Sequence, residues 1–209
     1  MGAKRRKSME KEKARFYVTI SRQFGSGGAE VGSKVAAKLG IRCYDKSISE
    51  MTSAVTGVAK NVVISSEEQV AETFWYSGFL GGESATYDKV NGAHEKVIQK
   101  LAKKGSCVFV GRCASHVLEK EHDNVIKIFI CAPIEIRRKR VSEGYKITPV
   151  EAGKLIAKND KARSAYYKKY TGKEWGKPEN YDLIINTRIG TAKAATIIAD
   201  FVKSIMKNK

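Results

Sequence analysis

This sequence has few cysteines and no long apolar run. Its 209 residues include four cysteines, which lie far apart and form no C-x-x-C pair. This excludes a disulfide framework or zinc site of the usual spacing and indicates a reducing cytoplasm. The longest apolar runs, IKIFICA and CVFV, are too short to cross a bilayer. The first 15 residues are basic with no apolar segment behind them, so we expect a flexible tail over 1–15 rather than a secretory signal.

Acidic residues are few compared with basic ones. The chain has 22 Asp and Glu against 39 Lys and Arg, a formal net charge of +17. Such an excess attracts polyanions such as nucleic acid, and it equally suits an enzyme that holds several phosphate groups in one cleft. The sequence does not show the aromatic residues among basic ones that are typical of RNA-binding surfaces. We therefore expect small phosphate-bearing molecules as partners, rather than nucleic acid or a membrane.

Short apolar runs alternate with amphipathic stretches along the chain. Runs such as CVFV are apolar throughout, as expected of strands covered on both faces of a parallel sheet. We expect a glycine-broken aromatic loop at 74–87, strands at 16–20, 41–45, 107–111, 125–132 and 181–186, and helices at 29–39, 46–71, 91–104, 133–144, 149–170 and 191–206. The alternation predicts an α/β fold, a three-layer α/β/α sandwich with a parallel sheet, formed by one domain over 16–209.

The stretch YVTISRQFGSGGAEVGSKVAAKLG, residues 17–40, has the order of a phosphate-binding loop: a strand, then glycines, then a helix. It lacks the lysine of the pattern G-x-x-x-x-G-K-[ST]. A frame that begins at Gly27 would place Gly32 inside the following helix. We prefer the frame that follows the strand directly, in which Arg22 takes the place of the first glycine, Gly27 that of the second, and Gly28 that of the lysine.

In this frame the backbone N–H groups from Phe24 to Ala29 can surround a phosphate at the helix N-terminus. The missing cation has to come from elsewhere, and Arg22 at the mouth of the loop is the nearest candidate. Ser21 and Ser26 carry hydroxyls that could reach a phosphate or a metal ion. On spacing alone, a glycine-rich turn that binds nothing is equally compatible with the pattern. The candidate phosphate-binding residues are Ser21, Gln23, Phe24, Gly25, Ser26, Gly27, Gly28 and Ala29.

The sequences of several segments, taken in order, closely resemble those of the cytidylate kinase-like family. Its members are relatives of bacterial cytidylate kinase among the P-loop nucleoside monophosphate kinases. The segments are TISRQFGSGGAEVGSKVAAKLGIRCYDKSI, CVFVGRCASHVL, IKIFICAPIEIRRKR, KNDKARSAYYKKYTGKEWG and YDLIINT. The resemblance covers most of residues 16–209. It implies a P-loop kinase fold with a helical acceptor-binding insert over 46–105 and a lid over 141–176.

The resemblance also implies roles for individual residues. The loop from Arg22 to Ala29 would hold the β-phosphate of ATP. Asp45 matches the acidic residue that begins the monophosphate-binding region, and Gly111 with Arg112 matches the pair whose arginine clamps the phosphate of the acceptor. The lid would contribute Lys158, Asp160 and Arg163, and the helix before it Arg137, Arg138 and Arg140.

Arginines from several directions suit phosphoryl transfer, which depends on positioning and on stabilising charge on the phosphoryl oxygens. The same charged residues also have interpretations that involve no phosphate binding. Asp160 and Arg163, three residues apart on one helix face, could form an ordinary surface ion pair. Arg137, Arg138 and Arg140 could equally form a solvated helix face.

We therefore expect an enzyme that transfers the γ-phosphoryl group of ATP, with Mg²⁺, to a nucleoside monophosphate, CMP or dCMP first. Three departures from the family pattern bear on this hypothesis: Gly28 replaces the lysine, Cys113 follows Arg112 where an acidic residue is usual, and 46–105 does not match the usual cytosine-binding insert. The alternatives are a kinase for another small acceptor, a nucleotide-binding protein without catalysis, and, on charge alone, a nucleic-acid-binding module.

Overall fold

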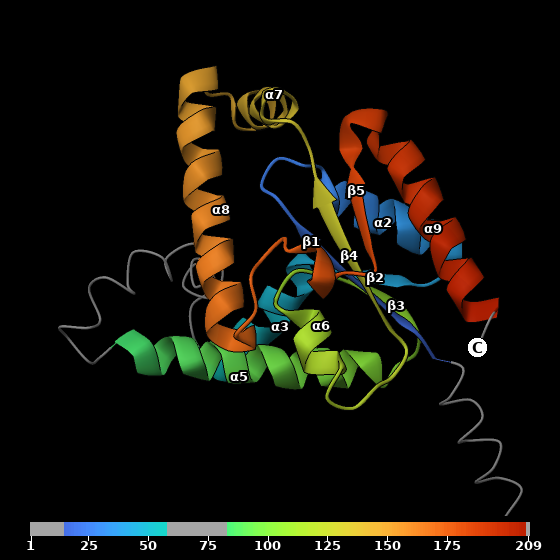
Figure 1. The fold of residues 1–209 in the computed structure, drawn as a ribbon. Coiled ribbons are helices and arrows are strands. Elements are labelled where there is room, and N and C mark those ends of the chain that lie inside the picture. The colour runs from blue at the N-terminus through green and yellow to red at the C-terminus, as the bar shows by residue number, and fades with distance from the viewer. Residues whose placement is uncertain (1–14, 58–82, 208–209) are drawn as a thin grey trace, which may run out of the picture.

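A parallel sheet of five strands forms the centre of the molecule in the computed structural model, which describes residues 15–57 and 83–207 (Figure 1). The strands are β1 Tyr17–Arg22, β2 Arg42–Tyr44, β3 Cys107–Val110, β4 Val125–Cys131 and β5 Leu183–Asn186. Their order across the sheet is β2-β3-β1-β4-β5, and every pair is parallel. This confirms the predicted α/β fold class.

Helices cover both faces of this sheet (Figure 1). They are α2 Gly28–Leu39, α3 Lys46–Thr56, α5 Glu83–Ala102, α6 Ala114–Leu118, α7 Ile134–Tyr145, α8 Pro149–Thr171 and α9 Thr191–Lys207. On one face α2 packs against α9, and on the other α5 packs against α3 and α6. The pair α7 and α8 stands beyond the carboxyl ends of the strands, where ligands of open parallel sheets bind.

The apolar pattern of the sequence explains this packing. All four residues of β3 are buried, because helices cover both sides of that strand. In α2, Val31 and Val35 are fully buried and face Ile198 and Val202 of α9 across the first core. A helix with one apolar stripe must bury it against the sheet, and these two helices share the same face.

The boundaries of three expected helices can be compared with the structure. α8 begins with a capping box: the Thr148 hydroxyl accepts from the Glu151 N–H, and the Glu151 carboxylate accepts from the Thr148 N–H, so the expected start of this helix at 149 is confirmed. α3 ends at Thr56, with Gly57 in the left-handed conformation that terminates helices. α5 begins at Glu83, so the aromatic loop expected over 74–87 was wrong for its last five residues. Residues 58–82 of the expected helix and loop lie outside the described residues.

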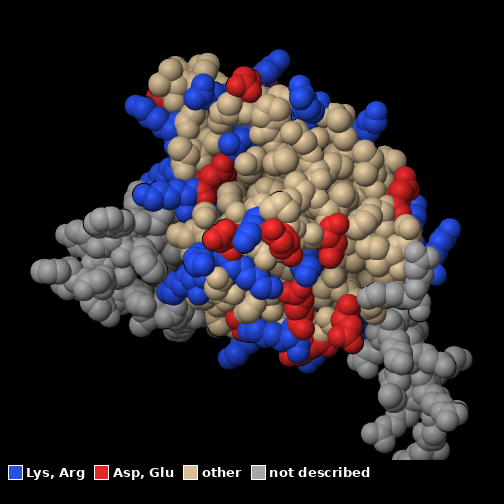
Figure 2. Space-filling view, in the orientation of Figure 1, with Lys and Arg blue, Asp and Glu red and all other residues tan. Residues whose placement is uncertain are grey.

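The structure bears on two expectations from the sequence, one about membrane-spanning segments and one about the excess of basic side chains. None of the helices within 15–57 and 83–207 is long and apolar enough to span a bilayer. Lys and Arg side chains are scattered over the face shown in Figure 2, and Asp and Glu side chains lie among them near its centre.

Candidate functional site

The glycine-rich loop leaves the sheet where its winding direction reverses. β1 lies between β3 and β4, and the chain runs from β1 first toward β2 and β3 and later toward β4 and β5. Ligands of open parallel sheets bind in the crevice at such a switch point, outside the carboxyl ends of the strands. The loop at 23–27 connects the end of β1 directly to α2. Gly32 lies inside α2, consistent with the frame preferred from the sequence.

Arg22 fills the space between this loop and the turn after β3. A β-carbon on Gly28 would lie 2.5 Å from the β-carbon of Arg22, and one on Gly111 would lie 2.0 Å from its Nη1. The same guanidinium lies 3.7 Å from the carboxylate of Asp45. The loop therefore has a long side chain at the first glycine position of the usual pattern and none at the lysine position, and the two features depend on each other sterically.

The start of α2 presents backbone donors that fit a phosphate. Among the described residues, the N–H groups of Gly27, Gly28 and Ala29 have no hydrogen-bond acceptor, as expected for the first turn of a helix. Gly25 and Gly27 adopt φ of +74° and +81°, a conformation that glycine adopts without strain. These donors and the helix dipole together favour an anion at this point.

Three arginines from α7 and α8 hold the carbonyl groups of the same loop. Arg137 donates to Phe24 O at 3.2 Å, Arg140 to Ser26 O at 2.8 Å, and Arg163 to Arg22 O at 2.9 Å. The solvated helix face considered from the sequence is therefore wrong for Arg137, which is buried, and for Arg140, which is half-buried, whereas Arg138 is exposed. These three arginines fix the position of the loop through its backbone.

Asp160 links α8 to this arrangement. One carboxylate oxygen accepts from the Phe24 N–H at 2.7 Å, and the other pairs with Arg137 Nη1 at 2.5 Å. The side chains of Arg137 and Asp160 are only 10% and 20% exposed, so their charges interact in a poorly solvated place. Asp160 thus occupies a loop N–H that the sequence assigned to phosphate, and its carboxylate forms an ion pair with Arg137.

The turn after β3 carries the second group of predicted residues. Gly111, Arg112 and Cys113 adopt φ of +80°, +59° and +49°, so three successive residues are left-handed. Such backbone is costly for residues other than glycine and concentrates at functional sites. The turn aims Arg112 toward α3, where its Nη2 donates to Ser49 Oγ.

A cavity of about 330 Å³, including its open mouth, lies between these two turns and α8. It is lined by Ser21, Arg22, Gly111, Arg112, Cys113, Arg163, Tyr166, Tyr167 and Trp175. Three of these side chains are arginines and none is a carboxylate, so the cavity attracts anions. Arg163 also lies over the ring of Phe24, 5.3 Å from its centroid, which fixes its stem beside the loop.

Tyrosine hydroxyls behind the cavity wall are held in hydrogen bonds. Tyr166 donates to Asn91 Oδ1 at 2.7 Å, and Tyr167 bonds to Tyr181, which also bonds to Ser21. Burial, assisted by the neighbouring Tyr181, raises the pKa of Tyr167 far above its usual value, and burial likewise raises the pKa of Tyr181. Both phenols therefore stay neutral and contribute no negative charge to the cavity.

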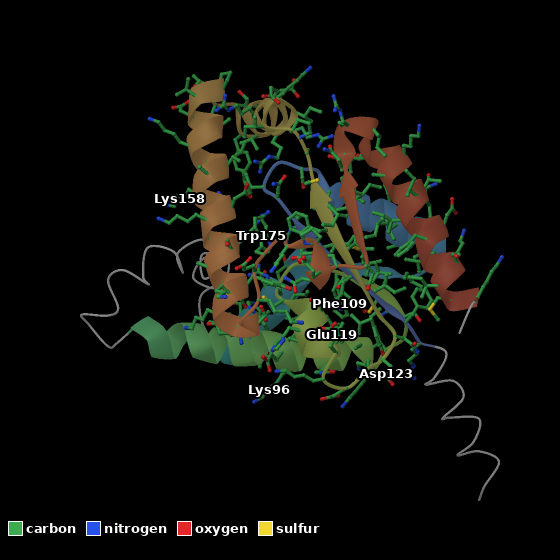
Figure 3. All side chains as sticks on the ribbon, viewed as in Figure 1. Lys96, Phe109, Glu119, Asp123, Lys158 and Trp175 are labelled. Carbon is green, nitrogen blue, oxygen red and sulfur yellow. The ribbon has the colours of Figure 1, made fainter. Side chains whose placement is uncertain are left out.

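The structure brings together most but not all of the predicted site. Arg22, Arg112 and Arg163 line one cavity, with Ser21 and Gly111. Lys158 is exposed on the outer side of α8 and points away from the sheet (Figure 3). Ser26 is fully buried, and its hydroxyl donates to Gln23 O at 2.8 Å. Gln23 in turn accepts from the Ala132 N–H through its side-chain amide.

Sequence reasoning missed two contributors. Thr187 is buried, and its hydroxyl donates to Ser26 O at 2.7 Å although 161 residues separate the two. Trp175 lines the cavity, and Figure 3 shows it between α8 and the sheet. Both lie in segments that carried the family resemblance, but single-residue spacing gave no reason to select them. Within the described residues no three His, Cys, Asp or Glu side chains form a group that could hold a metal ion.

Comparisons with known proteins identify the family of the chain. The model of the cytidylate kinase-like family matches residues 17–189. A cytidylate kinase from Methanopyrus kandleri is 30% identical over 96 residues, which cover 43% of this chain and 50% of that protein. The chain thus matches about half the length of that curated relative.

Two solved structures share the fold. The crystal structure of an uncharacterized protein from Eubacterium ventriosum is 26% identical, with a TM-score of 0.70, and the match covers 91% of this chain and 99% of that one. Shikimate kinase from Bacteroides thetaiotaomicron is 12% identical with a TM-score of 0.54, covering 90% and 98%, which is a likeness of fold alone. Because the family model spans most of its length, the chain belongs to the cytidylate kinase-like family.

Proposed function

We propose that this protein transfers the γ-phosphoryl group of ATP to a nucleoside monophosphate, CMP or dCMP being the first candidates. The observation that carries the proposal is the cavity with three arginines and no carboxylate, placed directly beside a glycine-rich loop with unpaired N–H groups. The family and the name of its curated relative support the same reaction class.

The chemistry needs no covalent intermediate on the protein. An oxygen of the acceptor's phosphate attacks the γ-phosphorus, the bond from that phosphorus to the β,γ-bridging oxygen breaks, and the products are ADP and a nucleoside diphosphate. Mg²⁺ entering with ATP would neutralise charge on its phosphates. The N–H groups of Gly27, Gly28 and Ala29 would bind the β-phosphate of the donor.

Different arginines would bind the acceptor's phosphate and stabilise the charge that develops during transfer. Arg112, from the turn after β3, and Arg163, from α8, would hold the acceptor's phosphate, because a planar guanidinium can bind two of its oxygens at once. Arg22, between the loop and Gly111, would stabilise the charge that develops between donor and acceptor, in place of the absent lysine. Asp45 would orient Arg22 through their ion pair. The stretches 46–105 and 141–176 would serve as acceptor-binding insert and lid.

The experiment measures ADP formed from Mg-ATP with CMP, dCMP, UMP, AMP or GMP, and with no acceptor as the control. Turnover that depends on one monophosphate would establish the function and name the substrate. Equal ADP formation with and without these acceptors would contradict a monophosphate acceptor and favour a kinase for another small molecule.

A nucleotide-binding protein without catalysis is the second candidate. It is favoured by Asp160, whose carboxylate occupies the Phe24 N–H, and by Gly28 at the lysine position. Tight ATP binding with no ADP formed against any acceptor would support it.

A further inference from the structure

Phe24, in the glycine-rich loop, is joined to α7 and α8 through its backbone. Its N–H donates to one carboxylate oxygen of Asp160 at 2.7 Å, and its C=O accepts from Arg137 Nη1 at 3.2 Å. The same Arg137 nitrogen pairs with the other carboxylate oxygen of Asp160. One ion pair between two helices therefore binds both polar groups of a single loop residue.

Apolar packing holds the loop against the helical hairpin of α7 and α8. The Phe24 ring packs against the buried cluster of Val141, Ala152 and Ile156. Beside it, a β-carbon on Gly25 would lie 2.8 Å from a methyl carbon of Val141, so no side chain fits at this position. The loop and the hairpin are closely packed here, and this packing holds the Asp160 carboxylate on the Phe24 N–H.

Arg137 has more hydrogen-bond donors than Asp160 uses. Its side chain is more than nine-tenths buried, and a single nitrogen, Nη1, makes both of the contacts described above. Its Nε–H is buried and has no hydrogen-bond partner within the part of the chain that the structure describes. A guanidinium carries five N–H donors, and a buried donor without an acceptor is unfavourable. Arg137 therefore suits a ligand with more oxygens than a carboxylate, such as a phosphate.

The other hydrogen bonds from the hairpin to the loop differ in kind. Arg140 and Arg163 donate to carbonyl groups of the loop, and these bonds leave its N–H groups available. A phosphate bound at a glycine-rich loop accepts from N–H groups. Asp160 accepts from an N–H in the same way, so it is the side chain that a phosphate has to replace at Phe24.

The space available to a phosphate beside α8 is small. Behind its open mouth, the cavity beside Arg22, Arg112 and Arg163 has room for little more than a water molecule. Arg163 and Asp160 both belong to α8, so one helix carries a wall of the cavity and the carboxylate on the loop. Movement of α8 away from the loop would widen the cavity and withdraw Asp160 at the same time.

We propose that Asp160 is an internal competitor of phosphate ligands. Its carboxylate takes the position between the Phe24 N–H and Arg137 that phosphate oxygens would take, and a phosphate displaces it on binding. Displacement releases α8 from the loop, so phosphate binding and opening of the hairpin are coupled. Asp160 therefore lowers the affinity of the loop for phosphates. The inference rests on the proposed function only for the identity of ATP as the ligand.

Binding without turnover tests the proposal. Calorimetric titration compares the parent with Asp160→Ala, using ATP and inorganic tripolyphosphate with no acceptor present. We expect Asp160→Ala to bind both ligands about tenfold more tightly, the gain for a protein of which about a tenth is open before the change. Tripolyphosphate has no ring, so an equal gain for both ligands locates the competition at the phosphates. Unchanged or weaker binding of both ligands would overturn the proposal.

The matched control removes the same charge from the same hairpin. Glu135 is an exposed carboxylate in the first turn of α7. Because removal of any carboxylate favours anions somewhat, Glu135→Ala should bind both ligands slightly more tightly than the parent, by less than about twofold at physiological salt. Equal gains in Glu135→Ala and Asp160→Ala would reduce the effect to general charge and overturn the competitor.

A second variant decides the question if Asp160→Ala does not fold, which circular dichroism establishes. The amide of Asp160→Asn can still accept from the Phe24 N–H but carries no charge to pair with Arg137. Its affinity for tripolyphosphate should exceed that of the parent and lie below that of Asp160→Ala. An Asp160→Asn variant that binds tripolyphosphate no more tightly than the parent would contradict the proposal.

The two proposals fail separately. If Asp160→Ala binds ATP and tripolyphosphate more tightly but no acceptor supports ADP formation, the competitor stands and the kinase assignment falls. If ADP formation depends on a nucleoside monophosphate but Asp160→Ala binds ATP and tripolyphosphate no more tightly than the parent, the kinase assignment stands and the competitor falls.

Discussion

The β-carbon of Arg22 lies where a side chain on Gly28 would have to begin. A β-carbon at position 28 would be 2.5 Å from it, and 2.8 Å from the next carbon of the arginine. Real β-carbons do not approach other carbons so closely, so position 28 accepts only glycine while Arg22 is present. The missing lysine and the arginine at the first glycine position are thus one steric arrangement.

This relationship predicts that Gly28→Lys destabilises the protein unless Arg22 is also replaced. Overpacking of a buried site costs about 1–3 kcal/mol. In the double variant Arg22→Gly with Gly28→Lys, the clash is absent, and the free energy of unfolding should exceed that of Gly28→Lys alone. Urea denaturation of the parent, Arg22→Gly, Gly28→Lys and the double variant measures these free energies. If the two substitutions simply add, the steric coupling is wrong.

Arg22→Ala should reduce turnover much more than stability. The guanidinium lies beside Asp45 and Gly111 in the proposed path of transfer, and removing one donor from such a site costs about 100-fold or more in kcat. The free energy of unfolding should change by about 1 kcal/mol, because Asp45, the partner left behind, is 29% exposed and can be solvated by water.

The matched control for Arg22→Ala is Arg42→Ala, which removes an exposed arginine from β2. ADP formation and thermal unfolding are measured for both variants. Normal turnover in Arg22→Ala would show that Arg22 does not replace the lysine, and equal losses in both variants would point to a general charge effect.

Asp160→Asn should loosen the contact between α8 and the glycine-rich loop. The amide can still accept from the Phe24 N–H, but the partly buried Arg137 loses its counter-charge, which costs about 1–3 kcal/mol. Hydrogen exchange of the Phe24 amide should become faster together with the lower stability. Asp200→Asn, at an exposed carboxylate on α9, is the control and should behave like the parent. An Asp160→Asn variant as stable as the parent would mean that this ion pair contributes nothing.

Sequence patterns predicted the sheet better than they predicted the site. A strand such as β3, buried on both faces, is apolar at every position and is recognised without any tertiary information. The start of α5 was misjudged because the glycines and aromatic residues before it are typical of loops, whereas packing against α3 and α6 stabilises the helix.

The site itself depends on contacts between distant segments. Arg22, Arg112 and Arg163 could be selected from the family resemblance, and the structure places them around one cavity. Nothing in the spacing of Ser26 and Thr187 shows that they meet, because 161 residues separate them. Lys158 and Asp160 differ by two positions, about 200° of helix, so only Asp160 can face the loop while Lys158 faces outward.

Thr187→Val tests the importance of that distant contact. The variant keeps the shape of the side chain but removes the hydroxyl that donates to Ser26 O, which keeps its hydrogen bond from Arg140. Because the same hydroxyl also accepts from Arg140 at 3.0 Å, two hydrogen bonds are lost, and the free energy of unfolding should fall by about 1–2 kcal/mol. The glycine-rich loop should also be held less firmly in place, so the Kd for ATP should rise. Thr196→Val, an exposed threonine on α9, is the control. Unchanged ATP binding in a destabilised Thr187→Val would confine Thr187 to a structural role.

Cys107 predicts a specific loss of stability at high pH. Burial raises the pKa of this thiol on β3 to about 12, from 9.0 in the unfolded chain, with a smaller contribution from Cys43. Between these two values the folded protein holds a proton that the unfolded chain releases. The stabilisation is therefore complete below about pH 9 and is lost as the pH rises toward 12, by at most about 1.4 kcal/mol per pH unit.

The measurement compares the parent with Cys107→Ala by urea denaturation at pH 8.0 and pH 10.5 (chosen as about one unit below and one and a half above the unfolded thiol pKa). The alanine variant should be less stable at the lower pH, because a buried sulfur is removed and a small cavity remains. Its deficit should shrink at the higher pH, since only the parent has to release the proton on unfolding. A deficit that stays constant would mean that the thiol titrates alike in the folded and unfolded chains, and that burial on β3 does not perturb it.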